Sequence, residues 1–139
     1  STVFSIGTAS GTNVNGQTQV AYCFSEVAGY SAFGSYTGNG SADGPFVFTG
    51  FRPRFVMWKS SSNAGTEWAM YDTSRSTYNV MGEYLLANQS SAGASNSGVD
   101  FLSNGFKLKL AGGGSTNASG YTYIYMAFAE NPFKLSLAR

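Results

Sequence analysis

Short runs in which apolar and polar residues alternate recur along the chain, and this period of two is typical of β-strands. In the longest run, Tyr121–Glu130, three tyrosines share one face and Ile124, Met126 and Phe128 share the other. Arg54–Lys59 is apolar on both faces, which predicts a central strand covered on both sides.

A helical period of 3.6 is missing from the stretch best suited to show it. Thr66–Met81 is the longest segment without Gly or Pro, but only its first part is apolar and its second part is polar with turn character. We therefore predict a strand at Trp68–Tyr71, followed by a turn in which Asp72 and Arg75 form an ion pair.

Shorter alternating runs predict the remaining strands. They are Val3–Ile6, Gln17–Phe24, Phe33–Tyr36, Pro45–Thr49, Glu83–Asn88, Val99–Leu102 and Phe106–Leu110. Val20, Tyr22 and Phe24 fall on one face of their run, and Phe46 and Phe48 fall together on theirs.

The last two of these runs flank Ser103-Asn104-Gly105, which is a hairpin signal. In the second arm of this hairpin we expect Phe106, Leu108 and Leu110 to face the core, and Lys107 and Lys109 to face water.

The strands, about eight to ten in number, are separated by turn clusters and not by helical connections. The pattern predicts an all-β fold, an antiparallel β-sandwich of jelly-roll or concanavalin-like type, forming a single domain over residues 1–139. Gly/Ser/Asn-rich stretches at Ser60–Gly65, Asn88–Gly98 and Gly112–Gly120 are expected to be mobile loops, and Gly38–Gly44 a wide strand connection.

The composition narrows the classes of partner. Charged residues make up 11% of the 139 residues, against roughly 25% in typical soluble domains, and the net charge is +1. No basic stripe is available for phosphate, which argues against nucleic acid. No apolar run approaches the ~18 residues of a membrane helix, so we expect no membrane insertion.

The residue inventory argues against an enzyme. The chain has no histidine, so a Ser-His-Asp or Cys-His arrangement and a histidine metal site are impossible. The single cysteine, Cys23, lies in an alternating run and is expected to be buried. Carboxylates for a glycosidase pair are scattered, and most adjoin turns. They are Glu26, Asp43, Glu67, Asp72, Glu83, Asp100 and Glu130. We expect no catalytic residues, metal or cofactor.

Aromatic residues are the feature most open to a functional interpretation, because they form 16% of the chain. Exposed rings stack on sugars or bury themselves between subunits, whereas buried rings fill a core. The candidate glycan or interface contacts are Trp58, Trp68, Tyr71, Tyr84, Tyr121, Tyr123 and Tyr125. Among them the row Tyr121, Tyr123 and Tyr125 is the best single candidate for an interface.

Several separated blocks of sequence form one ordered pattern along the chain. The blocks are Ala21–Ser25, Tyr36–Gly40, Gly44–Val47, Thr49–Lys59, Tyr71-Asp72 with Arg75, Leu86–Asn88, Val99–Phe101, Asn104–Phe106 and Tyr123–Glu130. From about Ala21 to Phe133 the chain resembles a virion structural domain of tailed phages, of tail-fibre or decoration type, associated with laminin-G/concanavalin-like modules in marine phages. Trp58 stands where an aliphatic residue is more usual in that pattern.

The resemblance implies a tail-fibre, tail-tip or capsid-decoration protein on the surface of a virion. It brings no catalytic or binding residues. The expected partners are further copies of the chain, as a trimer or higher homo-oligomer, and other virion proteins. The alternative is a carbohydrate-binding module that recognises a host surface glycan.

Overall fold

The computed structural model describes residues 3–132, and in that range all regular structure is β. Residues 1–2 and 133–139 of the expected domain, including Phe133 at the end of the resemblance, lie outside the described part. The strands are β1 (Ser31–Thr37), β2 (Phe46–Phe48), β3 (Pro53–Ser60), β4 (Ala69–Asp72), β5 (Met81–Leu86), β6 (Ala94–Leu102), β7 (Gly105–Leu108) and β8 (Thr122–Ala129).

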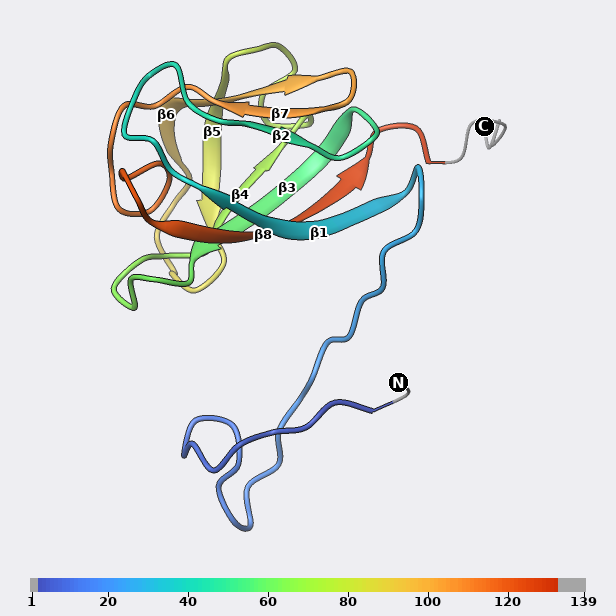
Figure 1. The fold of residues 1–139 in the computed structure, drawn as a ribbon, viewed down its shortest axis with the longest axis vertical. Helices are drawn as coiled ribbons and strands as arrows, with labels where there is room; N and C mark the ends of the chain where they lie inside the picture. The colour runs from blue at the N-terminus through green and yellow to red at the C-terminus, as the bar shows by residue number, and fades with distance from the viewer. Residues whose placement is uncertain (1–2, 133–139) are drawn as a thin grey trace.

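Hydrogen bonding joins the eight strands into one antiparallel sheet in the order β1-β8-β3-β4-β5-β6-β7-β2. The sheet curls strongly, so that β1 and β2, its two edges, approach each other and the architecture is a nearly closed barrel (Figure 1). The Tyr36 ring on β1 meets the Phe106 ring on β7 edge-to-face across the interior, with centroids 6.2 Å apart. The all-β, antiparallel prediction is confirmed.

The strands predicted from the strongest alternation are found. β3 lies between β8 and β4, and both of its faces carry apolar residues, as expected of a central strand. The β6–β7 hairpin turns through Ser103 and Asn104, as predicted. Phe106 and Leu108 on β7 are fully buried, as predicted, whereas Leu110 lies beyond the strand and is half-buried.

Stacked rings fill the interior of the barrel. The Trp58 indole ring stacks on Tyr71 with centroids 4.9 Å apart and on Phe106 at 6.1 Å, and the Tyr71 ring stacks in turn on Tyr84 at 5.3 Å. Tyr36 and Tyr123 form a second stacked pair at 4.9 Å. Aromatic residues therefore bind the two ends of the curled sheet to each other through its core.

The loop Gly112–Gly120, predicted to be mobile, is instead packed into the fold. Asn117 is completely buried, and its amide donates to Asn39 Oδ1, Ser41 O and Leu110 O at 2.8–3.1 Å. Its side-chain oxygen accepts from the Asn39 backbone N–H at 2.9 Å. One side chain thus joins this loop to the β1–β2 connection, because it satisfies backbone groups of both.

The strand predictions for Val3–Ile6 and Gln17–Phe24 are wrong for the isolated chain. Both segments are exposed and neither forms a strand, and they belong to a stretch that runs away from the barrel (Figure 1). Cys23 within it is exposed, not buried. We call residues 3–24 the arm.

Phe46 and Phe48 do share a face, but that face is the solvent side of β2. Their side chains are 46% and 65% exposed, and Val47 between them faces the core. Asn88–Gly98 is also less of a loop than predicted, because its second half belongs to β6.

Candidate functional site

The side of the sheet opposite the core carries a continuous line of apolar side chains. Register pairs place Phe33 (β1) beside Met126 (β8), Met126 beside Met57 (β3), Met57 beside Met70 (β4), and Met70 beside Leu85 (β5). We call these five residues the outer row. Each is half-buried, and together they span five neighbouring strands, a width of about 19 Å at the usual strand spacing.

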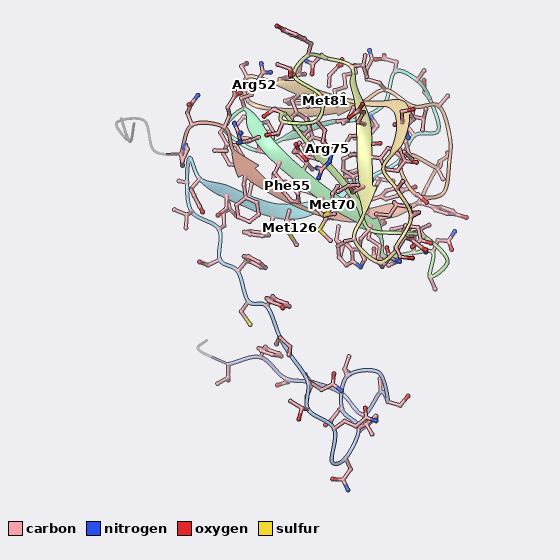
Figure 2. The ribbon with its side chains drawn as sticks, turned by 180° about the vertical axis from the view of Figure 1, so that it is seen from behind. Arg52, Phe55, Met70, Arg75, Met81 and Met126 are labelled. Atoms are coloured by element: carbon pink, nitrogen blue, oxygen red, sulfur yellow. The ribbon has the colours of Figure 1, made fainter. Side chains whose placement is uncertain are left out.

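A second line of rings flanks the outer row. Phe128 on β8 pairs with Phe55 on β3, and their ring centroids lie 6.2 Å apart. Phe33 meets Phe128 edge-to-face at 6.0 Å. On the other flank, Ile124 is 42% exposed. In Figure 2, Met70 and Met126 lie at the margin of the barrel on the side where the arm leaves it.

The base of the arm rests on this surface. The Phe24 ring stacks on Phe33 at 5.8 Å and meets Phe128 edge-to-face at 6.1 Å. The Ser31 hydroxyl holds the adjoining backbone, since it donates to Ser25 O at 3.2 Å and accepts from the Val27 N–H at 3.1 Å. Phe24 therefore covers one end of the outer row, while the methionines remain partly exposed.

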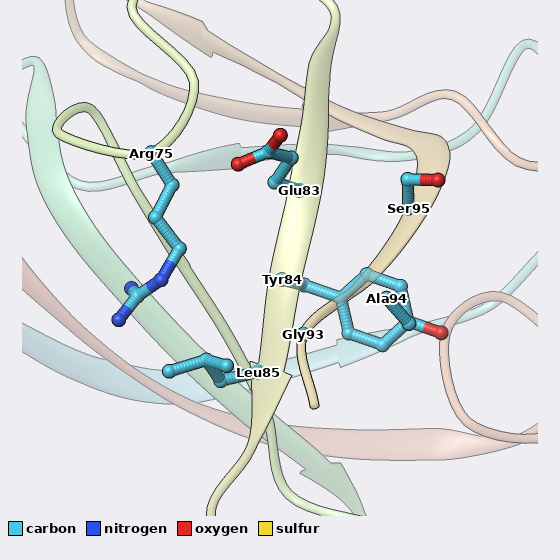
Figure 3. Close-up of a pocket in the computed structure, with 7 residues that line it drawn as sticks. All are labelled: Arg75, Glu83, Tyr84, Leu85, Gly93, Ala94 and Ser95. Atoms are coloured by element: carbon cyan, nitrogen blue, oxygen red, sulfur yellow. The ribbon is translucent and has the colours of Figure 1, made fainter. Parts of the chain in front are cut away.

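At its other end the outer row reaches a shallow hollow of about 450 Å³ at the β5–β6 boundary. Arg75, Glu83 and Leu85 lie on one side of β5, and Tyr84 lies on the other beside Ala94 (Figure 3). The Arg75 guanidinium forms an ion pair with Asp72, as predicted, and this pair closes the β4–β5 turn. Charged groups thus border the apolar surface here.

The seven aromatic residues predicted as glycan or interface contacts differ in burial. Trp58, Tyr71 and Tyr123 are at most 1% exposed, so they are core residues and cannot form a surface platform. The predicted row Tyr121, Tyr123 and Tyr125 points into the barrel. Tyr121 and Tyr125, at the two ends of the row, are half-buried and pack against the core. Trp68 is half-buried beside β4, and Tyr84 alone of the seven lines the hollow at β5–β6.

Burial also changes the pKa of the tyrosine hydroxyls. Desolvation raises the pKa of Tyr36, Tyr71, Tyr123 and Tyr125 above the ordinary value of 10.0. The phenol of Tyr36 donates to Thr116 O at 2.8 Å, and that of Tyr71 to Asn96 Oδ1 at 2.8 Å. These hydroxyls serve as structural donors.

Lys107 on β7 and Lys109 just after it each lie within 4 Å of a carboxylate. Lys107 forms an ion pair with Asp43 of the β1–β2 connection. The hydrogen bond from the Lys107 ammonium, and then its positive charge, lower the pKa of the Asp43 carboxyl. Lys109 lies 3.8 Å from Asp100 on β6. The predicted exposure of both lysines holds only in part, because each is half-buried.

Within residues 3–132, no group of three or more His, Cys, Asp or Glu side chains is placed to hold a metal ion. Nor does that range contain a helix long and apolar enough to cross a membrane. The outer row with its flanking rings is therefore the candidate functional surface.

The fold and this surface define an all-β domain whose most distinctive surface is apolar. The chain belongs to the family described as Domain of unknown function (DUF7483), whose model matches residues 1–132 and so includes the arm. No curated protein matches the chain, and no solved structure matches it.

Proposed function

We propose that the chain is a structural domain of a phage virion, a tail-fibre, tail-tip or capsid-decoration component, that works by assembling with copies of itself. The single observation that supports assembly is the outer row, in which three of the four methionines lie side by side across neighbouring strands. A contiguous apolar surface of this kind is typical of protein–protein contacts. Methionine suits such a surface because its flexible thioether adapts to a partner.

The assignment to a virion surface rests on the resemblance of the sequence blocks between Ala21 and Glu130 to tailed-phage domains. A β-sandwich of jelly-roll or concanavalin-like type accords with it. In that description β1, β8, β3 and β4 form one layer, β6, β7 and β2 form the other, and β5 connects them. The stacking of Trp58 on Phe106 between β3 and β7 supports two facing layers.

Sedimentation equilibrium tests the assembly. Wild-type chain is expected to sediment as a homo-oligomer, and Met126→Lys is expected to weaken its association about tenfold or more, because the ammonium would be buried without a partner. Ile124→Lys, at an already exposed position of the same face, should weaken it too and does not endanger the fold.

Phe48→Lys is the matched control, because Phe48 is an exposed apolar residue on β2. It should leave the oligomer mass unchanged. A wild-type chain that stays monomeric at all concentrations, or an oligomer indifferent to both outer-face substitutions, contradicts the proposal. Mass spectrometry of purified particles tests the location: the chain should be present in many copies, and its absence would refute the virion assignment.

A carbohydrate-binding module is the second candidate, and the hollow at β5–β6 favours it. Tyr84 supplies a partly exposed ring there, and Arg75 and Glu83 supply polar groups of the kind that bind sugar hydroxyls. On a glycan array, binding that is lost in Tyr84→Ala and retained in Phe48→Ala would support this site. Absence of binding by folded wild-type chain would exclude it.

A further inference from the structure

The arm combines exposed apolar side chains with a complete lack of charge. Phe4, Ile6, Val20 and Tyr22 are between 55% and 83% exposed. No charged residue occurs between residue 1 and Ser25, and the polar residues of the arm are all uncharged Ser, Thr, Asn or Gln. Exposed apolar residues at this density indicate a segment that is buried in another context.

The arm does not form a core of its own. Its hydrogen bonds include the turn bonds Thr12 N–H to Ala9 O and Gln17 N–H to Val14 O, and the Asn13 amide donates to Gly7 O. Phe4, Ile6 and Val20 line a hollow of about 440 Å³ that is open to solvent. A segment of this size cannot bury enough apolar area to offset its conformational entropy.

The same chain carries an apolar surface that lacks a cover. Phe24 occupies one end of that surface, on Phe33 and Phe128, and the arm then leaves it (Figure 1). Beyond Phe24 the methionines of the outer row remain partly exposed. The outer face measures on the order of a few hundred Å² by strand spacing, whereas a standard stable interface needs about 800 Å² from each partner. A second contributor is therefore needed.

We propose that copies of the chain exchange arms: Val20 and Tyr22 of one copy cover Met57, Met70 and Met126 of a second copy. This inference rests on the proposed assembly and names the segment that accomplishes it. The period-two pattern of residues 17–24 matches an extended segment that presents one apolar side to a surface. The arm and the outer row are both uncharged, so their contact buries no unpaired charge.

The side chains suit each other. The ring of Tyr22 meets thioethers, and sulfur–aromatic contacts are favourable while the methionines adjust to the ring. The family model includes the arm, which fits a segment that acts as part of the domain. Val20 lies four residues before Phe24, a span of about 14 Å in extended chain, so the exchange requires the outer rows of the two copies to face each other closely.

Complementation between two variants tests the exchange. Tyr22→Lys damages the arm and leaves the outer row intact, whereas Met57→Lys damages the outer row and leaves the arm intact. Each variant alone is expected to associate at least about tenfold more weakly than wild type. A 1:1 mixture should regain mixed oligomers, visible by their masses in native mass spectrometry, since each mixed pair keeps one undamaged contact. Both substitutions add a positive charge, so charge attraction cannot produce the recovery.

Each result decides a separate point. Wild-type monomers at all concentrations overturn the exchange together with the proposed assembly. Oligomers disrupted by Met57→Lys but not by Tyr22→Lys overturn the exchange and leave the assembly standing. Disruption by both variants without recovery on mixing shows that each arm covers its own outer row, which also overturns the exchange. Circular dichroism establishes that both variants are folded.

Discussion

The Trp58 indole ring lies against the Tyr71 phenol ring at a centroid distance of 4.9 Å and an interplanar angle of 17°, inside the barrel. The indole N–H donates to Ser115 O at 3.0 Å. Trp58 thereby joins β3, β4 and the loop that follows β7. It holds the sheet in its curled form and takes no part in surface recognition.

Trp58→Phe should therefore lower the free energy of unfolding by about 1–3 kcal/mol, because it removes a buried hydrogen bond and leaves a void. Trp68→Phe is the matched substitution at a half-buried position, and we expect it to cost about 1 kcal/mol or less. Urea unfolding followed by circular dichroism measures both. Equal effects of the two substitutions would contradict the assignment of Trp58 to the core.

Asn117 joins two loops through four hydrogen bonds. Asn117→Ala should cost about 3 kcal/mol, since it strands buried donors and acceptors that water cannot reach. Asn88→Ala is the control, because Asn88 also lies in an Asn-x-Ser sequence but is exposed. A smaller loss of stability for Asn117→Ala than for Asn88→Ala would refute the role of the buried amide.

Alkaline pH should destabilise the fold through its buried tyrosines. Burial raises the pKa of Tyr36 and Tyr71 in the folded chain, whereas the unfolded chain ionises near 10.0. Their contribution is thus complete below pH 10 and is lost as the pH rises above it, by about 1.4 kcal/mol per pH unit for each phenol.

Urea unfolding at a series of pH values measures this slope. Tyr36→Phe and Tyr71→Phe should each reduce it by the share of one phenol. A slope that neither substitution changes would assign the alkaline loss of stability to other groups.

Gly105 is needed for a close approach between strands rather than for the hairpin turn. A Cβ at this position would lie 2.1 Å from Val47 O on β2. Gly105→Ala should therefore destabilise the chain by about 1–3 kcal/mol through forced separation of β7 and β2. Gly65→Ala, where a Cβ meets only the Asn63 side chain at 3.6 Å, should stay within about 0.5 kcal/mol of wild type. Comparable costs for both in thermal or urea unfolding would contradict this account.

The strands with strong alternation could be predicted from the sequence, and β3, β8 and the β6–β7 hairpin show it. The face that each strand buries could not, because β3 and β8 are apolar on both sides. The tyrosine row of residues 121–125 was accordingly predicted as a surface and lies on the inner side. Pairing decides the matter: Ala127 and Tyr123 fit the interior beside Val56 and Tyr36.

The outer row could not be predicted because its members are far apart in the sequence. Met57 and Met126 meet only through the register between β3 and β8, and Met70 joins them through that between β3 and β4. The strand predicted at Gln17–Phe24 illustrates the opposite case. The alternation of apolar and polar residues is present in the sequence, but this segment pairs with no strand of the same chain.

Methionine methyl signals test the central claim, that the outer row is an assembly surface, most directly. In chain labelled with ¹³C-methyl methionine, three probes lie on the outer row, and Met81, completely buried in the core, is an internal reference. With a soluble paramagnetic agent, the methyls of Met57, Met70 and Met126 should be broadened in dilute samples and protected in concentrated ones, while Met81 is protected throughout. Outer-row methyls that remain equally broadened at every concentration would contradict the account.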